Sequence, residues 1–367
     1  MAVRVFFDLP HLYYLPQYQP VIHALEARGA SSKLVCYRGA HTAMEATVAN
    51  EKCSVEWVDD TRAALQLYQQ QSPDWVIFGN AFRYAQEIPR ATRRGLVYHA
   101  SGTGFKTASL HPGMTDVDVR FVSGPERVPV FREQFPDVDL VEVGFAKLDP
   151  LFAEQPDGLA FDLSKAGLNP ELPTLLFAPT FYPSCIEYMS AAWPEDFARY
   201  NLLIKPHDFT LTKSRYKKQR RLLHAWAEYP NVYLATELEY SLLPFMARAD
   251  LLITDRSSAL FEFVALDKPG VICDFVKLRW TYRGPLRFRL RQRMASSREP
   301  FADDICVRVP HYRALFETVE RALANPGEKS AARRLYRDRV MGACDGKAGE
   351  RIAEYLLNHS NRVAQSH

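Results

Sequence analysis

The residues Ala249-Asp-Leu-Leu-Ile-Thr-Asp-Arg-Ser-Ser-Ala-Leu-Phe-Glu-Phe263 join an apolar run to a helical pattern in the second half of the chain. Leu251–Thr254 has the length and apolar character of a buried parallel strand, and the pattern from Ala259 is that of a helix. Ser257 and Ser258 stand where that helix begins. A helix N-terminus offers unpaired N–H groups and the positive end of its dipole, so the two hydroxyls predict a diphosphate site here. A plain serine N-cap is the competing interpretation.

Short apolar runs alternate with helical patterns on both sides of this segment. The predicted strands are Val3–Phe7, Lys33–Tyr37, Val55–Val58, Trp75–Phe78, Arg94–His99, Val119–Val122 and Val141–Val143 in the first half, and Leu175–Ala178, Leu202–Lys205, Val232–Leu234, Leu251–Thr254 and Gly270–Asp274 in the second. Strands separated by helices form parallel sheets, so the pattern predicts an α/β protein with two Rossmann-like domains. Two such halves in tandem are typical of the glycosyltransferase-B architecture, in which the domains face a cleft.

The boundary between the two halves is marked by a change of composition. Asp149–Pro173 holds four prolines and few long apolar runs, which indicates a connection between domains. We therefore expect a first, acceptor-side domain over residues 1–155 and a second, donor-binding domain over residues 156–345. A C-terminal helix within residues 346–367 is expected to pack back towards the cleft. Helical patterns also cover Tyr312–Ala324 and Gly349–Leu357.

The bulk properties are those of an ordinary globular protein, and its 367 residues suit two domains. The 46 basic and 43 acidic residues give a net charge of +3, which by itself does not argue for a nucleic-acid partner. The six cysteines form no C-x-x-C pair, which argues against a zinc or redox motif and suits a reducing cytoplasm. The first residues have the pattern of a strand rather than a signal peptide. No apolar run approaches the roughly 18 residues that span a bilayer, so we expect any membrane contact to be peripheral.

Two further polar segments follow predicted strands of the second half. Lys205 and His207 come directly after the strand in Leu202–Asp208, and both are suited to phosphate oxygens. His207 could also titrate near neutral pH. A solvated loop with a chance histidine is the alternative. Thr180 follows the strand in Leu176–Tyr182, where it could bind a ligand or cap the next helix.

One such segment lies in the first half. In Val97-Tyr-His-Ala-Ser-Gly-Thr-Gly-Phe-Lys106 a strand ends near His99, and a glycine-containing turn leads to Lys106. Glycines allow backbone amides to approach a ligand closely, although an ordinary turn is equally compatible with the pattern. The segment lacks the spacing of a Walker loop and of a dinucleotide fingerprint. All of these segments end predicted parallel strands, where an interdomain cleft would lie.

The order of these motifs resembles that of the CDP-glycerol glycerophosphotransferase family, the teichoic-acid glycerophosphate primases and polymerases. The resemblance covers roughly residues 174–357. The family's A-P-T-F segment is similar to Ala178–Phe181, and its basic-x-His-Pro segment to Lys205–His207. Its D-[VL]-L-I-T-D-Y-S-S turn is similar to Asp250–Ser258, and its D-G-x-A-S-x-R motif to Asp345–Arg351.

The first half is less similar to the family. His99–Lys106 looks like a longer form of the family's His-Gly-Thr-Pro-Leu-Lys motif, and Val143–Asp149 resembles its Gly-x-Pro-Arg-x-Asp segment. Arg256 stands where the family usually has Tyr, Tyr182 stands where Arg or Trp is usual, and Asp208 replaces a Pro. These departures leave the exact donor and acceptor open.

The resemblance implies transfer of a polyol phosphate from CDP-glycerol or a close relative. An acceptor hydroxyl attacks the β-phosphorus and CMP leaves, a reaction that depends on positioning and charge stabilisation. His99 is then the general base, and His207 is a second catalytic residue. Donor contacts are expected from Thr180, Lys205, Asp255, Ser257, Ser258 and Arg351, and acceptor or phosphate contacts from Lys106 and Arg256. No cofactor and no metal are expected, because the acidic pairs Asp59-Asp60 and Asp303-Asp304 are interpreted as surface charge.

Two basic runs, Lys213–Arg221 and Lys277–Arg298, fit an anionic acceptor at a membrane. Each basic residue near an anionic leaflet contributes about 1 kcal/mol. The expected partners are a nucleotide-linked donor, a lipid-linked or polymeric polyol-phosphate or saccharide acceptor, and the inner face of the cell membrane. A solvated face or an RNA-binding patch is the alternative for the basic runs.

Two other functions remain open at this stage. A glycosyltransferase-B enzyme that uses a UDP- or CMP-sugar, or a sugar-nucleotide 2-epimerase, would have the same architecture. A nucleotide-binding module without catalytic activity is the third hypothesis.

Overall fold

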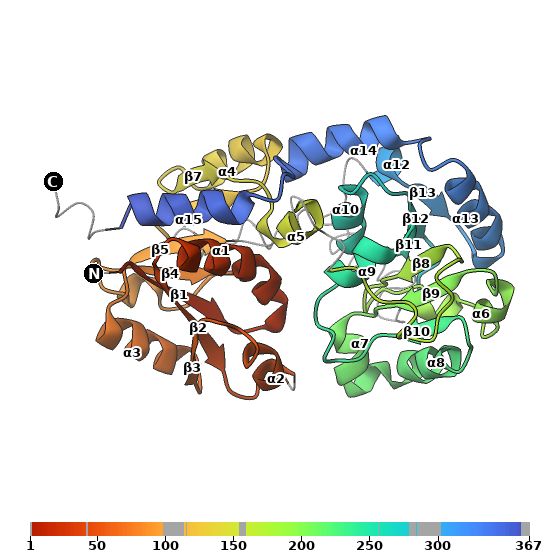
Figure 1. Ribbon diagram of the computed structural model, residues 1–367, viewed down its shortest axis with the longest axis horizontal. Coiled ribbons are helices and arrows are strands. Elements are labelled where there is room, and N and C mark those ends of the chain that lie inside the picture. Colours follow the sequence, from red (N-terminus) through yellow and green to blue (C-terminus); the bar gives the residue numbers. More distant parts are fainter. Residues whose placement is uncertain are drawn as a thin grey trace. The chain divides into compact units, whose positions relative to one another are not determined.

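The computed structural model describes residues 2–41, 43–97, 114, 116–153, 159–255, 257–278, 284 and 302–360 (Figure 1). The chain divides into two compact units, one of Met1–Glu154 with Asp338–His367 and the other of Gln155–Arg337. The boundary between the two units at Glu154 lies one residue from the expected one at 155. The second unit ends at Arg337 rather than at the expected Asp345, and the C-terminal helix belongs to the first unit.

The first unit is built on a parallel sheet with the order β3-β2-β1-β4-β5-β6-β7. Its strands are β1 (Arg4–Leu9), β2 (Ser31–Tyr37), β3 (Ser54–Val58), β4 (Trp75–Phe78), β5 (Arg93–Val97), β6 (Val119–Val122) and β7 (Asp139–Glu142). The strand order reverses between β1 and β4, as in a doubly wound Rossmann sheet.

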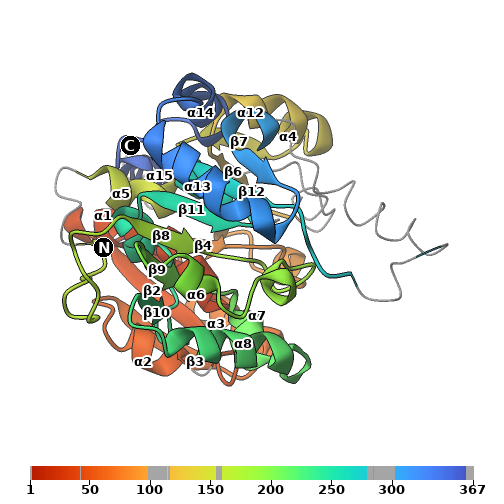
Figure 2. The same ribbon diagram turned by 90° about the vertical axis from the view of Figure 1, so that its right-hand side faces the viewer.

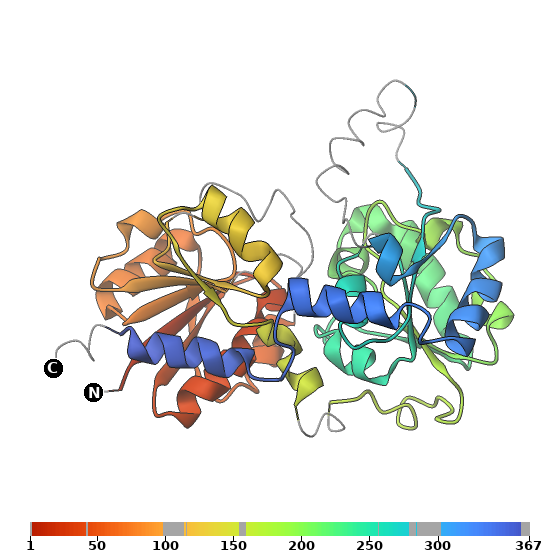
Figure 3. The ribbon, with the colours of Figure 1, turned by 90° about the horizontal axis from the view of Figure 1, so that it is seen from above.

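Helices cover both faces of this sheet. On one face, α3 (Thr61–Gln71) and α4 (Val128–Gln134) enclose an apolar cluster that includes Val76 and Phe78 of β4. On the other face, α1 (Leu15–Ala27) packs against α15 (Ala348–Asn358), and Figure 3 shows α15 lying along the first unit. The indole nitrogen of Trp75 donates to the carbonyl of Leu356 at 2.9 Å, so the C-terminal helix is bonded to the central strands.

The start of α15 is held by a buried carboxylate. Asp149 accepts hydrogen bonds from the amides of Ala348 at 3.2 Å and Gly349 at 2.7 Å. Burial raises the pKa of Asp149 to about 6, against the effect of these two amides. A Cβ atom on Gly349 would lie 2.6 Å from the carbonyl carbon of Pro20, so glycine is what allows α15 to approach α1 this closely.

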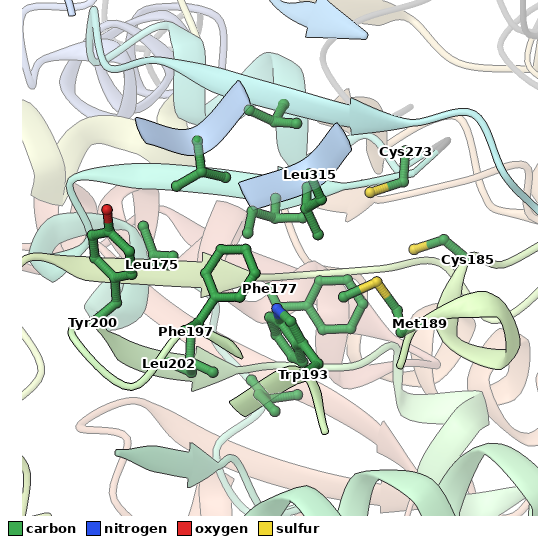
Figure 4. Close-up of a cluster of buried hydrophobic side chains, with 14 of the residues drawn as sticks. Leu175, Phe177, Cys185, Met189, Trp193, Phe197, Tyr200, Leu202, Cys273 and Leu315 are labelled. Carbon is green, nitrogen blue, oxygen red and sulfur yellow. The ribbon is translucent and has the colours of Figure 1, made fainter. Parts of the chain in front are cut away.

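The second unit repeats the same plan with the order β10-β9-β8-β11-β12-β13 (Figure 2). Its strands are β8 (Thr174–Phe177), β9 (Asn201–Ile204), β10 (Val232–Leu234), β11 (Leu251–Thr254), β12 (Gly270–Cys273) and β13 (Val307–Val309). Its core includes aromatic side chains in edge-to-face contact, with the ring centroids of Phe177 and Trp193 4.9 Å apart (Figure 4). The ring centroids of Trp193 and Trp226 are 5.0 Å apart. The prediction of two parallel-sheet α/β domains is confirmed.

The structure differs from the sequence prediction where elements are short. β13 was not predicted, because three residues carry too little periodicity. In the segment between β8 and β9 the only α-helix among the described residues is the short α6 (Trp193–Asp196), and Phe161–Ala166 forms hydrogen-bonded turns. The other helices are α2 (Met44–Val48), α5 (Asp149–Phe152), α7 (Asp208–Thr212), α8 (Lys217–Ala227), α9 (Leu243–Arg248), α10 (Ala259–Val264), α12 (Ala302–Ile305), α13 (Leu315–Ala324) and α14 (Ser330–Tyr336). None of the helices in the described segments is both long and apolar enough to cross a bilayer.

Candidate functional site

The polar segments singled out in the second half follow three adjacent strands of one sheet. Thr180 follows β8, Lys205 and His207 follow β9, and Asp255 follows β11. β8 lies between β9 and β11, and the strand order reverses between β8 and β11. Open α/β sheets bind ligands at the carboxyl ends of their strands at such a reversal. The topology therefore gathers these residues at the edge of the sheet where a ligand is expected.

Asp255 ties the two sides of this reversal together. Its carboxylate accepts from the amide of Thr180 at 2.8 Å, the amide of Cys185 at 3.1 Å and the hydroxyl of Ser184 at 3.1 Å. The side chain is almost fully buried, and burial raises its pKa to about 6 although these donors favour the ionised form. Asp255 thus holds the loop after β8, and its carboxylate oxygens are directed towards protein donors.

Ser184 and Cys185 were not predicted to take part in the site. Both lie beyond the A-P-T-F segment, and nothing in their local sequence distinguishes them from other loop residues. They meet Asp255 only because β8 and β11 pair in the sheet. The one local signal was the aspartate itself, which directly follows a buried strand.

The turn between β11 and α10 contains the two serines. The hydroxyl oxygen of Ser257 accepts from the amide of Ala259 at 3.3 Å, and the carbonyl of Ser258 accepts from the amide of Phe261 at 3.1 Å. Ser258 is the N-cap residue of α10 but makes no side-chain capping bond, so the bond that the N-cap interpretation expects comes from Ser257. A hydroxyl that accepts one hydrogen bond still has its own proton to donate, so capping does not prevent a contact between Ser257 and a phosphate oxygen.

His207 caps α7 and is held by aromatic neighbours. Its Nδ1 accepts from the amide of Phe209 at 3.1 Å, and its ring packs edge-to-face against Phe181 with centroids 4.7 Å apart. The residue is exposed, but the surrounding protein lowers its pKa to about 4, mainly by desolvation. An Nδ1 atom that accepts an N–H leaves the proton on Nε2. His207 is therefore neutral at pH 7, and it can donate a hydrogen bond without contributing charge.

Lys205 provides the positive charge at this edge of the sheet. Burial lowers its pKa, and the nearby carboxylates of Asp208 and Glu239 oppose that change. Glu239 is held in place by the Tyr233 hydroxyl, which donates to it at 2.9 Å. Among the described residues, no group of three His, Cys, Asp or Glu side chains is arranged to hold a metal ion.

The remaining predicted site residues do not lie among the described residues at this edge of the second sheet. Arg351 lies on α15 in the first unit, where it pairs with Asp345 and donates to the carbonyl of Val143 at 3.1 Å. These bonds connect the ends of the first unit's own segments. His99, Lys106 and Arg256 lie outside the described residues, as does most of the basic run from Lys277 to Arg298.

Comparison with protein-family models gives a match to the CDP-glycerol:poly(glycerophosphate) glycerophosphotransferase model over residues 97–358. The chain belongs to this family. The match begins two residues before His99 and includes every predicted site residue of both units. The sequence-based identification of a CDP-glycerol glycerophosphotransferase-like enzyme is thus confirmed at the level of the family.

The chain is similar in sequence to one curated protein and in fold to several solved structures. The teichoic acid ribitol-phosphate primase of Bacillus spizizenii is 29% identical over 163 residues, which cover 43% of this chain and 41% of the primase. A structure of the wall teichoic acid polymerase TagF has a TM-score of 0.67 at 14% identity, covering 97% of this chain and 88% of that one. A putative UDP-N-acetylglucosamine 2-epimerase from Listeria monocytogenes has a TM-score of 0.62 at 13% identity, covering 98% and 97%. These likenesses confirm the glycosyltransferase-B fold class.

The Asp255 interactions can be tested by comparing the two aspartates that bracket β11. Asp255→Ala leaves two amides and a hydroxyl without their acceptor, so we expect a loss of about 3 kcal/mol in the free energy of unfolding. Amide exchange should accelerate in residues 180–185. Asp250 accepts from the amide of Thr174 at 2.8 Å at the opposite edge of the sheet, so Asp250→Ala is the matched control.

Hydrogen exchange followed by mass spectrometry separates the two variants, because Asp250→Ala should affect the segment around Thr174 and spare residues 180–185. Equal protection of residues 180–185 in Asp255→Ala and in the parent chain would show that the loop does not depend on this carboxylate.

The protonation of His207 gives a pH prediction. Its pKa is about 4 in the folded chain, below the ordinary value of 6.5, so folding favours the neutral ring. The stability from this group is fully present above pH 6.5 and is lost as the pH falls through 4. An NMR titration should give a midpoint near 4 for His207, whereas the urea-unfolded chain should titrate near 6.5. A midpoint near 6.5 in the folded chain would contradict the assignment.

Proposed function

We propose that this protein transfers a polyol phosphate, glycerol phosphate in the first instance, from a CDP-linked donor to a hydroxyl of a polymeric or lipid-linked acceptor, with release of CMP. The reaction belongs to the synthesis of a cell-surface polymer of the teichoic-acid type. The observation that carries this proposal is the gathering of Thr180, Lys205, His207 and the Ser257–Ser258 turn at the reversal of the second sheet, in a chain of this family.

The donor's diphosphate rests on the second unit in this mechanism. Lys205 supplies positive charge, and the Ser257 and Ser258 hydroxyls donate to phosphate oxygens. His207 donates through Nε2–H, which stabilises charge on the departing CMP phosphate without the desolvation cost of a second buried cation. Asp255 does not touch the donor but keeps Thr180 and its loop in place.

The chemical step is a displacement at the β-phosphorus. The acceptor oxygen forms the new P–O bond while the bond from this phosphorus to the bridging oxygen breaks, and CMP takes the electron pair. The proton of the acceptor hydroxyl goes to His99, the general base that the family resemblance implies. No cofactor takes part in this scheme.

The test is CMP release from CDP-glycerol, measured beside CDP-ribitol, UDP-sugars and CMP-sugars with a polyol-phosphate acceptor. We expect release from a CDP-polyol, and a loss of roughly 10²–10⁴ in rate for His99→Ala with the donor affinity little changed. Ser257→Ala combined with Ser258→Ala should weaken donor binding instead. Ser190→Ala is the control, because Ser190 also accepts an amide two residues ahead, at 3.1 Å, but has no place in the motif.

Two outcomes would overturn the proposed reaction, and a third would overturn the role of His99. Turnover of a UDP- or CMP-sugar alone would favour the glycosyltransferase or 2-epimerase hypothesis. Nucleotide binding without any turnover would favour a non-catalytic module. Wild-type CMP release by a stable His99→Ala protein would remove His99 as the base.

We also propose that the acceptor is reached at the inner face of the cell membrane. Exposed cations gather on α8 and the turn before it, namely Lys213, Arg215, Lys217, Lys218 and Arg221. Arg220 is engaged in the fold, because it donates to the carbonyls of Thr210 and Lys213. This arrangement supports peripheral attraction to anionic lipid.

Reversing two of these charges, with Lys217→Glu and Lys218→Glu, should reduce binding to anionic vesicles by about tenfold or more. Co-sedimentation at several salt concentrations is the measurement, because surface attraction is screened over about 8 Å at physiological ionic strength. Lys52→Glu with Arg90→Glu reverses two exposed charges of the first unit and is the control. Binding that responds neither to salt nor to the Lys217 and Lys218 reversals would contradict the proposal.

A further inference from the structure

A pocket within the first unit opens at the carboxyl ends of β5, β6 and β7. The pocket opens to solvent. Val97, Phe121, Val143, Phe145 and Ile352 supply the apolar part of its lining. Two strongly polar side chains also line it, Gln17 from the first turn of α1 and Arg127 from the turn before α4. Both are buried, with only 2% of Gln17 and 6% of Arg127 exposed.

Gln17 points to a missing partner. Its Nε2 atom is buried and donates to no group among the described residues. A buried amide without a partner costs about 1–3 kcal/mol, so such a group is rare unless a ligand or water serves it. An apolar side chain of similar size would fill this place on α1 without that cost.

The charge of Arg127 indicates that the ligand of this pocket is an anion. A guanidinium is always ionised, and its planar fork of N–H groups matches the oxygens of a phosphate. An amide donor and a guanidinium that line the same pocket, one from α1 and one from the turn before α4, favour a compact anionic group over a neutral sugar ring. We propose that Arg127 and Gln17 form a phosphate-binding subsite of the first unit, which takes the phosphate of a polyol-phosphate acceptor.

Hydrogen bonds connect the segments that surround the pocket. Arg351 donates to the carbonyl of Val143, and the amide of Gly144 donates to the carbonyl of Ser123 at 3.0 Å. The hydroxyl of Ser123 donates to the carbonyl of Val340 at 2.9 Å. The returning C-terminal segment thus builds part of the wall. This gives Arg351 a role in shaping an acceptor pocket in place of a contact with the donor.

The identity of the ligand as an acceptor rests on the proposed function, because a polymer of polyol phosphates carries a phosphate next to its reactive terminal unit. Val97, which lines the pocket, is also two residues before the proposed base His99 in the sequence. Binding of a phosphate ester to the pocket requires no turnover, so the subsite can be tested separately from the reaction.

The experiment is calorimetric titration of the full chain with glycerol 3-phosphate, inorganic phosphate and glycerol. The Ser257→Ala, Ser258→Ala double variant serves as the parent, so that binding at the second unit is weakened. We expect glycerol 3-phosphate to bind, inorganic phosphate to compete with it and glycerol alone not to bind. Gln17→Leu should lower the affinity by about tenfold or more, because one charge-assisted hydrogen bond is lost. Gln19→Leu, on the same helix but outside the pocket, is the matched control.

Gln17→Glu is a second variant of nearly the same shape, and it should abolish phosphate binding by repulsion even if the leucine variant folds poorly. The proposal is overturned if the parent binds no phosphate ester, or if Gln17→Glu and Gln19→Leu bind it equally well. Loss of binding in Gln17→Glu by a chain that never releases CMP would support the subsite and refute the proposed reaction. If Gln17→Glu binds glycerol 3-phosphate as well as its parent does, and the wild-type chain releases CMP, the subsite is refuted and the proposed reaction is supported.

Discussion

The carboxylate of Asp255 is the interaction on which the arrangement of the second unit's site depends. The reversal of strand order between β8 and β11 sends the chain away in opposite directions on either side, so nothing in the sheet itself ties the two following loops together. Asp255 does so through the amides of Thr180 and Cys185 and the hydroxyl of Ser184. A buried charge is tolerated there because three donors compensate its lost hydration.

The first unit depends in a similar way on a buried aspartate, but one that joins segments far apart in the chain. Asp149 caps the beginning of α15, and the absence of a side chain on Gly349 allows that helix to lie close to Pro20 of α1. The D-G-x-A-S-x-R motif of the family has a serine at the position of Gly349. The Asp345–Arg351 pair of this motif belongs to the same junction.

The Asp255 and Asp149 junctions shape the two sites that we propose, a donor site in the second unit and an acceptor phosphate site in the first. Groups of the second unit that meet the donor combine one cation, Lys205, with neutral hydrogen-bond donors from His207 and the serines. The pocket of the first unit combines one cation, Arg127, with the amide of Gln17. Among the described residues, each site combines a cation with neutral hydrogen-bond donors, and neutral donors carry a smaller desolvation cost than further cations would when no ligand is bound.

The sequence by itself determined the two parallel-sheet domains, because buried strands such as Leu251–Thr254 are continuous apolar runs whose period and length are local properties. It also indicated Lys205, His207 and the Ser257–Ser258 turn, because each follows such a strand. Only the tertiary structure decided what these groups do. The neutral state of His207 comes from its desolvation beside Phe181, and the role of Asp255 comes from the pairing of β8 with β11. The return of the C-terminal helix to the first unit and the pocket with Gln17 depend on contacts between residues hundreds of positions apart in the chain, which no local pattern records.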